Sequence, residues 1–267
     1  MMLFKLFRAE LVRSVLLLIR YPIEFIVGLG ILYSLFMGLF LGARSLVQDP
    51  RTMGASIDSF VISYVLWFFV ISALGRLAFQ IQEEAQAGVL EQIFLNYPRV
   101  LGLLLVRCLV DFFESFAMVA VLLVLIMAST GRWITLTAVE LGQVILLFSL
   151  TVIGIYGFGL IFAGLALVFK RLGQHDAIEQ CAFVVMAYRP LDSVAWWLRL
   201  LLYCLPLSLG AQLIKLVAVE HYDIFAAAVQ PKLLGLLVNS LAYLLFGSLI
   251  YLACERRAKM DGRLGQY

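Results

Sequence analysis

Long apolar segments alternate with short polar ones along the chain, and most are long enough to cross a bilayer as a helix. A fifth segment, beginning near residue 178, is interrupted at Tyr188-Arg189-Pro190, and residues 190–225 stay apolar but contain Pro206 and several charges. That stretch predicts short re-entrant helices in the outer leaflet. The pattern predicts a single-domain (1–267), all-α polytopic membrane protein with six transmembrane helices: 22–42, 57–79, 100–129, 141–169, the interrupted fifth, and 233–254.

Residues 1–20 predict an amphipathic helix ahead of the first span. Basic residues fill one broad arc of it, and apolar residues fill the opposite stripe: Lys5, Arg8, Arg13 and Arg20 against Phe4, Phe7, Leu11, Val15 and Leu18. This pattern is typical of an interfacial helix whose basic side faces anionic headgroups. The alternative is a basic flank that only orients the first span.

The most polar run between two predicted spans is residues 83–97. Its periodicity predicts a short amphipathic helix with one apolar and one polar side: Val89, Leu90, Ile93 and Phe94 against Glu83, Glu84, Gln86, Glu91, Gln92 and Asn96. Tyr97 should end the helix, because the residue before a proline is pushed out of the α region. Such a helix lies on the headgroups or binds another protein. Three glutamates and no lysine argue against an anionic membrane surface.

The distribution of lysine and arginine predicts the orientation. The six-span arrangement places 13 of the 20 on the side of the N-terminus, residues 83–97 and the tail, and 7 on the other side. The side with the excess is expected to be cytoplasmic. The protein is then predicted to lie in the cell (inner or plasma) membrane, with both termini and the 83–97 helix on the cytoplasmic side.

Charged residues also fall inside the third span. Arg107, Asp111 and Glu114 are spaced i, i+4 and i+7, so they share one helix face. A charge at bilayer depth is costly unless it is paired, so this face should point into protein or water. This face lines a transport path, forms part of the linkage from the 83–97 helix, or is neutralised locally by pairing of Arg107 with Asp111, which is the favoured interpretation for that pair. Glu114 then lacks a partner in its own helix, and Arg76 either is that partner or lies at the inner interface.

Composition excludes several classes of protein. Hydrophobic residues make up 64% of the chain and charged residues 14%, against about 25% charged in soluble domains. Four cysteines without a CxxC pair and two distant histidines predict no metal site. The sequence contains no GxxxxGK[ST], GxSxG or HExxH, so it predicts neither an enzyme nor a nucleotide cofactor on this chain. No basic run interleaved with aromatics suggests nucleic acid.

Four glycines in the fourth predicted span, at residues 154, 157, 159 and 164, predict close packing of helices rather than a ligand site.

The order Glu84-x-Gln86-x-Gly88-Val89-Leu90-Glu91, followed by an apolar pair and Pro98, resembles the cytoplasmic loop of type-2 ABC (ATP-binding-cassette) exporter permeases. The layout is similar too, with an amphipathic elbow helix first and a Leu205-Pro206-Leu207 segment among the re-entrant helices. The resemblance implies that 83–97 is a coupling helix in an ATPase cleft. Val89, Leu90, Ile93 and Phe94 would be buried there, Glu84 and Glu91 would meet the rim, and Gly88 would permit close approach.

The resemblance further implies the permease subunit of an ATP-driven exporter. It would work with a second permease copy and a separate ATPase subunit that holds ATP and Mg²⁺. The expected substrate is lipophilic or lipid-like, such as a drug, lipid or natural product; a polysaccharide or glycolipid is the alternative. Two rivals remain on the residues alone. One is an intramembrane enzyme using Asp111, Glu114 and Glu24 as acid and base groups, and the other is an ion-coupled carrier working through Glu114.

Overall fold

The structure is a computed structural model, and it describes residues 2–46, 53–97, 100–131, 137–168, 206–224, 226 and 229–260. These residues form helices and turns without any strand. The helices are α1 (Met2–Arg20), α2 (Pro22–Leu46), α3 (Met53–Gln86), α4 (Leu90–Asn96), α5 (Val100–Thr130), α6 (Ala138–Val168), α9 (Pro206–Ala218) and α10 (Gln230–Met260). The all-helical class predicted from the sequence is therefore confirmed for the described part of the chain.

Within the described ranges, four helices are long and apolar enough to cross a membrane: Pro22–Gly42, Val100–Thr130, Ala138–Val168 and Gln230–Met260. They coincide with four of the predicted spans. The predicted second span lies inside α3, a single helix of 34 residues in which Ser59–Phe69 is a shorter apolar stretch. The predicted fifth span and residues 190–205 lie outside the described residues, so the six-span arrangement stays a prediction.

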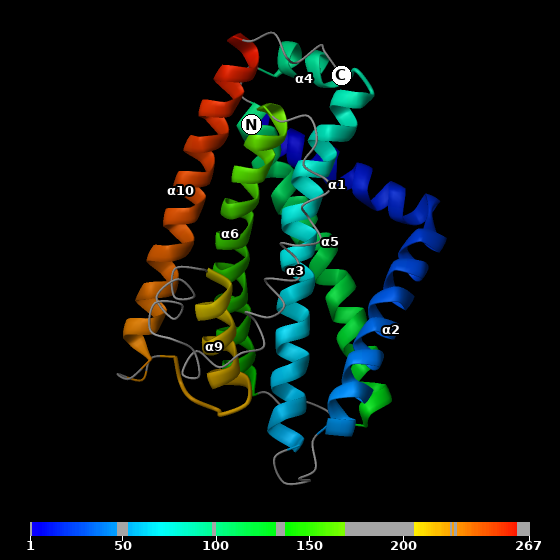
Figure 1. The fold of residues 1–267 in the computed structure, drawn as a ribbon, viewed down its shortest axis with the longest axis vertical. Helices are drawn as coiled ribbons and strands as arrows, with labels where there is room; N and C mark the ends of the chain where they lie inside the picture. The colour runs from blue at the N-terminus through cyan, green and yellow to red at the C-terminus, as the bar shows by residue number, and fades with distance from the viewer. Residues whose placement is uncertain are drawn as a thin grey trace.

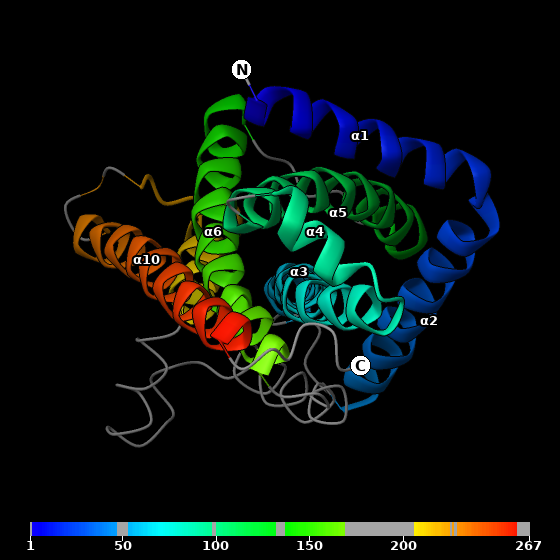
Figure 2. The same ribbon diagram turned by 90° about the horizontal axis from the view of Figure 1, so that it is seen from above.

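Helices α2, α3, α5, α6 and α10 run side by side, and α1 lies at a steep angle to them near one end, along the outer side of α5 (Figures 1 and 2). The break between α1 and α2 comes from Tyr21-Pro22, because Tyr21 precedes a proline and Pro22 suits the first turn of a helix. The separate helix predicted for residues 1–20 is confirmed. Helix α4 and the last turns of α10 lie at the same end as α1, whereas α9 lies toward the opposite end.

The closest helix packing joins α6 and α10, and it depends on glycines. A Cβ added to Gly157 would lie 2.5 Å from the backbone N of Leu244, and one added to Gly164 would lie 3.0 Å from the Cα of Tyr251. On α10, a Cβ at Gly247 would collide with the carbonyl of Gly157. The two backbones are in contact here, which confirms the predicted packing role for Gly157 and Gly164. Helix α9 approaches the other side of α6 at Thr151.

Helix α2 is attached to the bundle by aromatic side chains. Phe36 is fully buried and makes edge contacts with Phe60 and Tyr64 of α3. The hydroxyl of Tyr64 donates a hydrogen bond of 2.7 Å to the carbonyl oxygen of Leu32, one turn earlier on α2. This contact fixes α2 against α3 away from the end where α1 crosses.

The single helix predicted over residues 83–97 is divided at Gly88. The N–H of Val89 donates to the carbonyl of Glu84 and the N–H of Gly88 donates to that of Ala85, at 2.9 and 3.1 Å. This pair of bonds is the Schellman motif, which ends a helix with a glycine in the left-handed region. Gly88 has φ +68°, and α3 ends at Gln86. Gly88 thus ends one helix and redirects the chain into the next.

Helix α4 ends where the sequence predicts. Tyr97 is extended, with φ −113° and ψ 108°, and its N–H still bonds the carbonyl of Ile93.

Substituting Gly88 with alanine should lower the free energy of unfolding by about 1–2 kcal/mol, because an L-residue is strained in the left-handed region. The midpoint of thermal unfolding in detergent, followed by circular dichroism, should fall by several degrees. The matched control is Gly30→Ala, in regular helix with open space around it, which should be neutral or stabilising. Equal midpoints for the two variants would contradict this role of Gly88.

Candidate functional site

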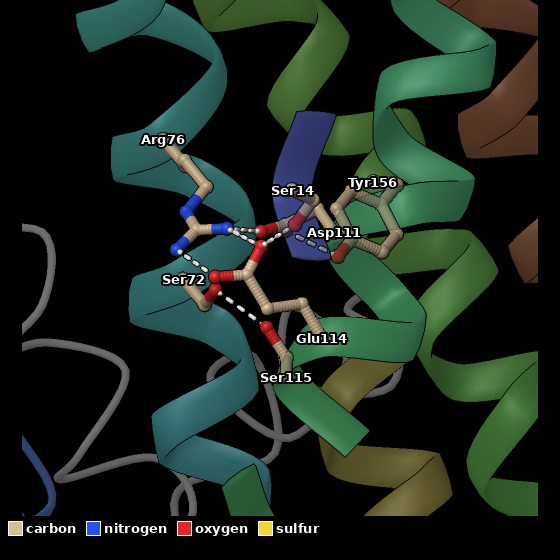
Figure 3. Close-up of polar contacts among 7 residues, drawn as sticks. All are labelled: Ser14, Ser72, Arg76, Asp111, Glu114, Ser115 and Tyr156. Carbon is tan, nitrogen blue, oxygen red and sulfur yellow. Dashed lines mark hydrogen bonds and ion pairs between the residues drawn. The ribbon is translucent and has the colours of Figure 1, made fainter. Parts of the chain in front are cut away.

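Arg76 of α3 binds two carboxylates of α5 (Figure 3). Its Nη1 donates to Asp111, and its two terminal nitrogens hold Glu114 in a bidentate pair at 3.0 and 3.3 Å. Asp111 is buried, with 8% of its surface exposed. Of the two alternatives left open for Arg76, the structure shows the pairing with Glu114, and the same guanidinium also binds Asp111.

Other helices complete this group of side chains. The hydroxyl of Tyr156 on α6 donates to Asp111 Oδ2 at 2.5 Å, and the hydroxyl of Ser14 on α1 donates to Glu114 Oε2 at 2.8 Å. Ser72 and Ser115 share a hydrogen bond of 3.0 Å beside them. We call the seven residues of Figure 3 the Arg76 cluster. Its contacts tie together four helices: α1, α3, α5 and α6.

Arg107 makes a second set of ion pairs nearer the end where α1 crosses. Its guanidinium holds Glu84 of α3 at 2.8 and 3.1 Å, and its Nε lies 3.4 Å from Glu10 of α1. We call these three residues the Arg107 bridge. Since Glu84 also closes the Schellman motif through its carbonyl, the bridge fixes α5 and α1 to the last turn of α3.

The favoured pairing of Arg107 with Asp111 is wrong. Side chains on a helix lean toward its N-terminus, so Arg107 points away from a residue four positions later. The order of basic residue first and acidic residue second is also the weaker one along a helix. Both residues find partners on other helices instead, which sequence spacing within α5 does not show.

A cleft of about 690 Å³ lies between α1, the start of α2, α3 and α5. We call it the α1 cleft. It contains both groups of ion pairs, together with Glu24, Glu83 and apolar side chains such as Phe79 and Met118. The carboxylates of Glu24, Asp111 and Glu114, predicted as possible acid and base groups, therefore do line one cavity.

Helix α4 does not present its apolar side outward. Leu90 is buried in this chain, with 2% of its surface exposed, and Phe94 packs partly against the same core. Lys259 of α10 lies over the Phe94 ring, 5.0 Å from its centre. The outward residues include Val89, 42% exposed, and Leu95, 79% exposed.

This arrangement changes which residues of the 83–97 segment a partner protein can contact. Leu90 is not available to a partner, and the side chain of Glu84 is engaged by Arg107. Gly88, Val89 and Glu91 remain exposed, Ile93 and Phe94 are half-buried, and Pro98 lies outside the described residues. Leu95 was not predicted to be an exposed apolar residue, although the sequence indicates it. On the helical wheel it lies on the polar side, between Glu91 and Gln92.

The described residues offer no cluster of three or more histidine, cysteine, aspartate or glutamate side chains suited to a metal ion. The two cysteines in this part of the chain, Cys108 and Cys254, are free thiols. Neither lies in the α1 cleft.

In the described part of the chain, the fold and the charged groups define an all-helical arrangement with four apolar helices of membrane-spanning length, as expected of a membrane-embedded chain. Ion pairs join one of these four, α5, to α3. No protein-family model matches the sequence, and no curated protein matches it significantly.

Proposed function

We propose that this chain is the permease subunit of an ATP-driven exporter, similar in organisation to the type-2 ABC permeases. It works in the cell membrane with a separate ATPase subunit and a second permease copy, which is identical or related. The observation that carries the proposal is α4: a short helix between two long ones, fixed to its own chain on one side and exposing apolar side chains on the other.

The exposed side of α4 suits a protein partner. Val89 and Leu95 supply apolar area, while Glu91 and Gln92 are exposed polar neighbours. An exposed apolar side chain with a polar surround is the usual composition of a binding surface. In this proposal Leu95 enters the ATPase cleft, in place of the Leu90 expected from the sequence.

The buried side of α4 suits transmission of movement. Leu90 lies in the core, and the Arg107 bridge joins the preceding turn of α3 to α1 and α5. A displacement of α4 by a closing ATPase would therefore reach three other helices directly.

The distribution of charge supports a cytoplasmic position for this end. The end that carries α1, α4 and the last turns of α10 also carries most basic residues of the described helices: Lys5, Arg8, Arg13, Arg20, Arg76, Arg107, Arg256, Arg257 and Lys259. An excess of lysine and arginine marks the cytoplasmic side of a membrane protein. The N-terminus and the end of α10 would then face the ATPase.

A second candidate function is a carrier coupled to ions through Glu114. The observation in its favour is that Glu24, Asp111 and Glu114 line one cleft. Against it, the guanidinium of Arg76 already pairs with both Asp111 and Glu114. The same ion pairs weaken the case for an intramembrane enzyme, because neither carboxylate is a free base.

Replacing Leu95 with aspartate should lower, by at least tenfold, the ATPase activity that co-purifies with the tagged chain from its native membrane. A charge in the centre of a protein interface is costly, and Leu95 is solvent-exposed, so the fold should survive. The measurement is vanadate-sensitive phosphate release per mole of purified chain.

The matched control is Met260→Asp. Met260 is 80% exposed at the same end of the molecule but belongs to α10. It should leave the recovered activity within twofold of the unaltered chain. Absence of any co-purifying ATPase with the unaltered chain, or equal loss in both variants, would reject α4 as the docking element.

A further inference from the structure

The α1 cleft carries more negative charge than its own ion pairs neutralise. Six carboxylates and three guanidinium groups line it, a formal excess of three negative charges. Arg76 serves Asp111 and Glu114, while Arg107 and Arg13 share Glu10, and Arg107 also holds Glu84. Within the residues that the structure describes, Glu24 and Glu83 have no basic partner.

Apolar side chains line the cleft beside the charged and polar ones. Leu17 and Leu18 of α1, Phe79 of α3 and Met118 of α5 contribute to this apolar part. Phe79 is 58% exposed, so its ring is accessible to a ligand. The volume of about 690 Å³ lies within the ordinary range for small-molecule sites.

The position of the cleft relates it to the membrane surface. It lies beneath α1 and at the start of α2, where Tyr21 and Glu24 also line it. Helix α1 has the composition of a helix that lies in the interface between headgroups and acyl chains. A molecule in the cleft would therefore have its charged part at headgroup depth and its apolar part toward the hydrocarbon.

We propose that the α1 cleft binds a cationic amphiphile: a protonated amine head held by Glu24 and Glu83, with a single alkyl or aryl tail along Leu17, Phe79 and Met118. The excess of carboxylates selects a net positive charge. A zwitterionic lipid is disfavoured, because its phosphate would meet the same negative field. An inorganic cation leaves the apolar walls without a partner. This inference rests on the proposed function, for which the cleft is the site that loads substrate from the inner leaflet.

The test is equilibrium binding of radiolabelled dodecylamine to the purified full-length chain in maltoside micelles, with empty micelles subtracted. We expect one saturable site per chain. Unlabelled dodecylamine should displace the label at least tenfold better than dodecanol, butylamine, Mg²⁺ or phosphatidylethanolamine. Displacement by dodecanol at equal concentration would show that dodecylamine only partitions into an apolar region. Displacement by butylamine or Mg²⁺ would show a site that takes any cation. Displacement by phosphatidylethanolamine would assign it to membrane lipid. Each of these results overturns the proposal.

Substitution adds a second arm. The double variant Glu24→Gln with Glu83→Gln should bind dodecylamine at least tenfold more weakly, while Glu91→Gln, on the exposed side of α4 and outside the cleft, should bind it normally. Glu24 and Glu83 are both exposed, so neither change empties a packed site. Unchanged affinity in the double variant would overturn the assignment of the amine head.

The result is separable from the proposed function, because binding is measured without an ATPase. A chain that binds dodecylamine but recovers no ATPase would reject the exporter and keep the cleft. A chain that recovers the ATPase but binds no amine would reject the cleft alone.

Discussion

Arg76→Met is expected to lower the free energy of unfolding by about 3 kcal/mol, because it leaves two carboxylates of α5 without their counter-charge. Asp111 is the costlier of the two, since it is buried and keeps only the hydroxyl of Tyr156 as a donor. Thermal unfolding in detergent, followed by circular dichroism, measures the loss. Arg13→Met is the matched control, because Arg13 is exposed and makes a single 3.4 Å contact with Glu10. It should change the free energy by less than about 1 kcal/mol.

The source of the Arg76 effect can be separated from loss of packing. Combining Arg76→Met with Asp111→Asn and Glu114→Gln removes the negative charges together with the positive one, so most of the stability should return. A triple variant as unstable as Arg76→Met alone would show that the guanidinium acts by filling space. An unaltered midpoint for Arg76→Met would mean that the cluster contributes nothing to stability.

Gly247→Ala is also expected to destabilise the protein, because the new methyl group has no space between α10 and α6. Its Cβ would overlap the backbone carbonyl of Gly157, and backbone cannot rotate away as a side chain does. Separating two packed helices to admit one methyl group costs about 1–3 kcal/mol or more. The expected readouts are a lower unfolding midpoint and a larger aggregated fraction in size-exclusion chromatography.

The control for Gly247→Ala lies on the same helix. Gly235 also belongs to α10, but a Cβ there would meet nothing within 4 Å. Gly235→Ala should therefore be neutral or slightly stabilising, since alanine is the better helix former. Similar damage from both substitutions would indicate that α10 tolerates no change in flexibility, and the close backbone contact would not be the cause.

The features that were predicted correctly depend on local signals. Tyr21-Pro22 marks the break between the crossing helix and the first span, and Tyr97 marks the end of α4, because proline restricts the residue before it. The four candidate spans that the structure shows as helices were predicted from length and hydropathy alone. Gly157 and Gly164 were assigned to packing because small residues in apolar helices usually mark close contacts.

The features that were missed depend on contacts between distant residues. Arg107 reaches Glu10 and Glu84, and Asp111 reaches Tyr156, so their pairing is set by how α1, α3, α5 and α6 are arranged. Periodicity within α5 places these residues on one face but does not choose their partners. The division of the 83–97 helix was missed for another reason. Gly88 is tolerated within a helix pattern, and the left-handed turn that it makes appears only with the bonds of the Schellman motif.

The contact between the Lys259 side chain and the Phe94 ring joins α4 to α10. Because α4 continues into α3 through Ala87, Gly88 and Val89 and also touches the last turns of α10, it connects these two helices at one end of the bundle. In the proposed exporter, a partner that presses on α4 would therefore displace α3 and α10 together. Since the backbone of α10 is in direct contact with that of α6, the displacement would extend to α6 as well.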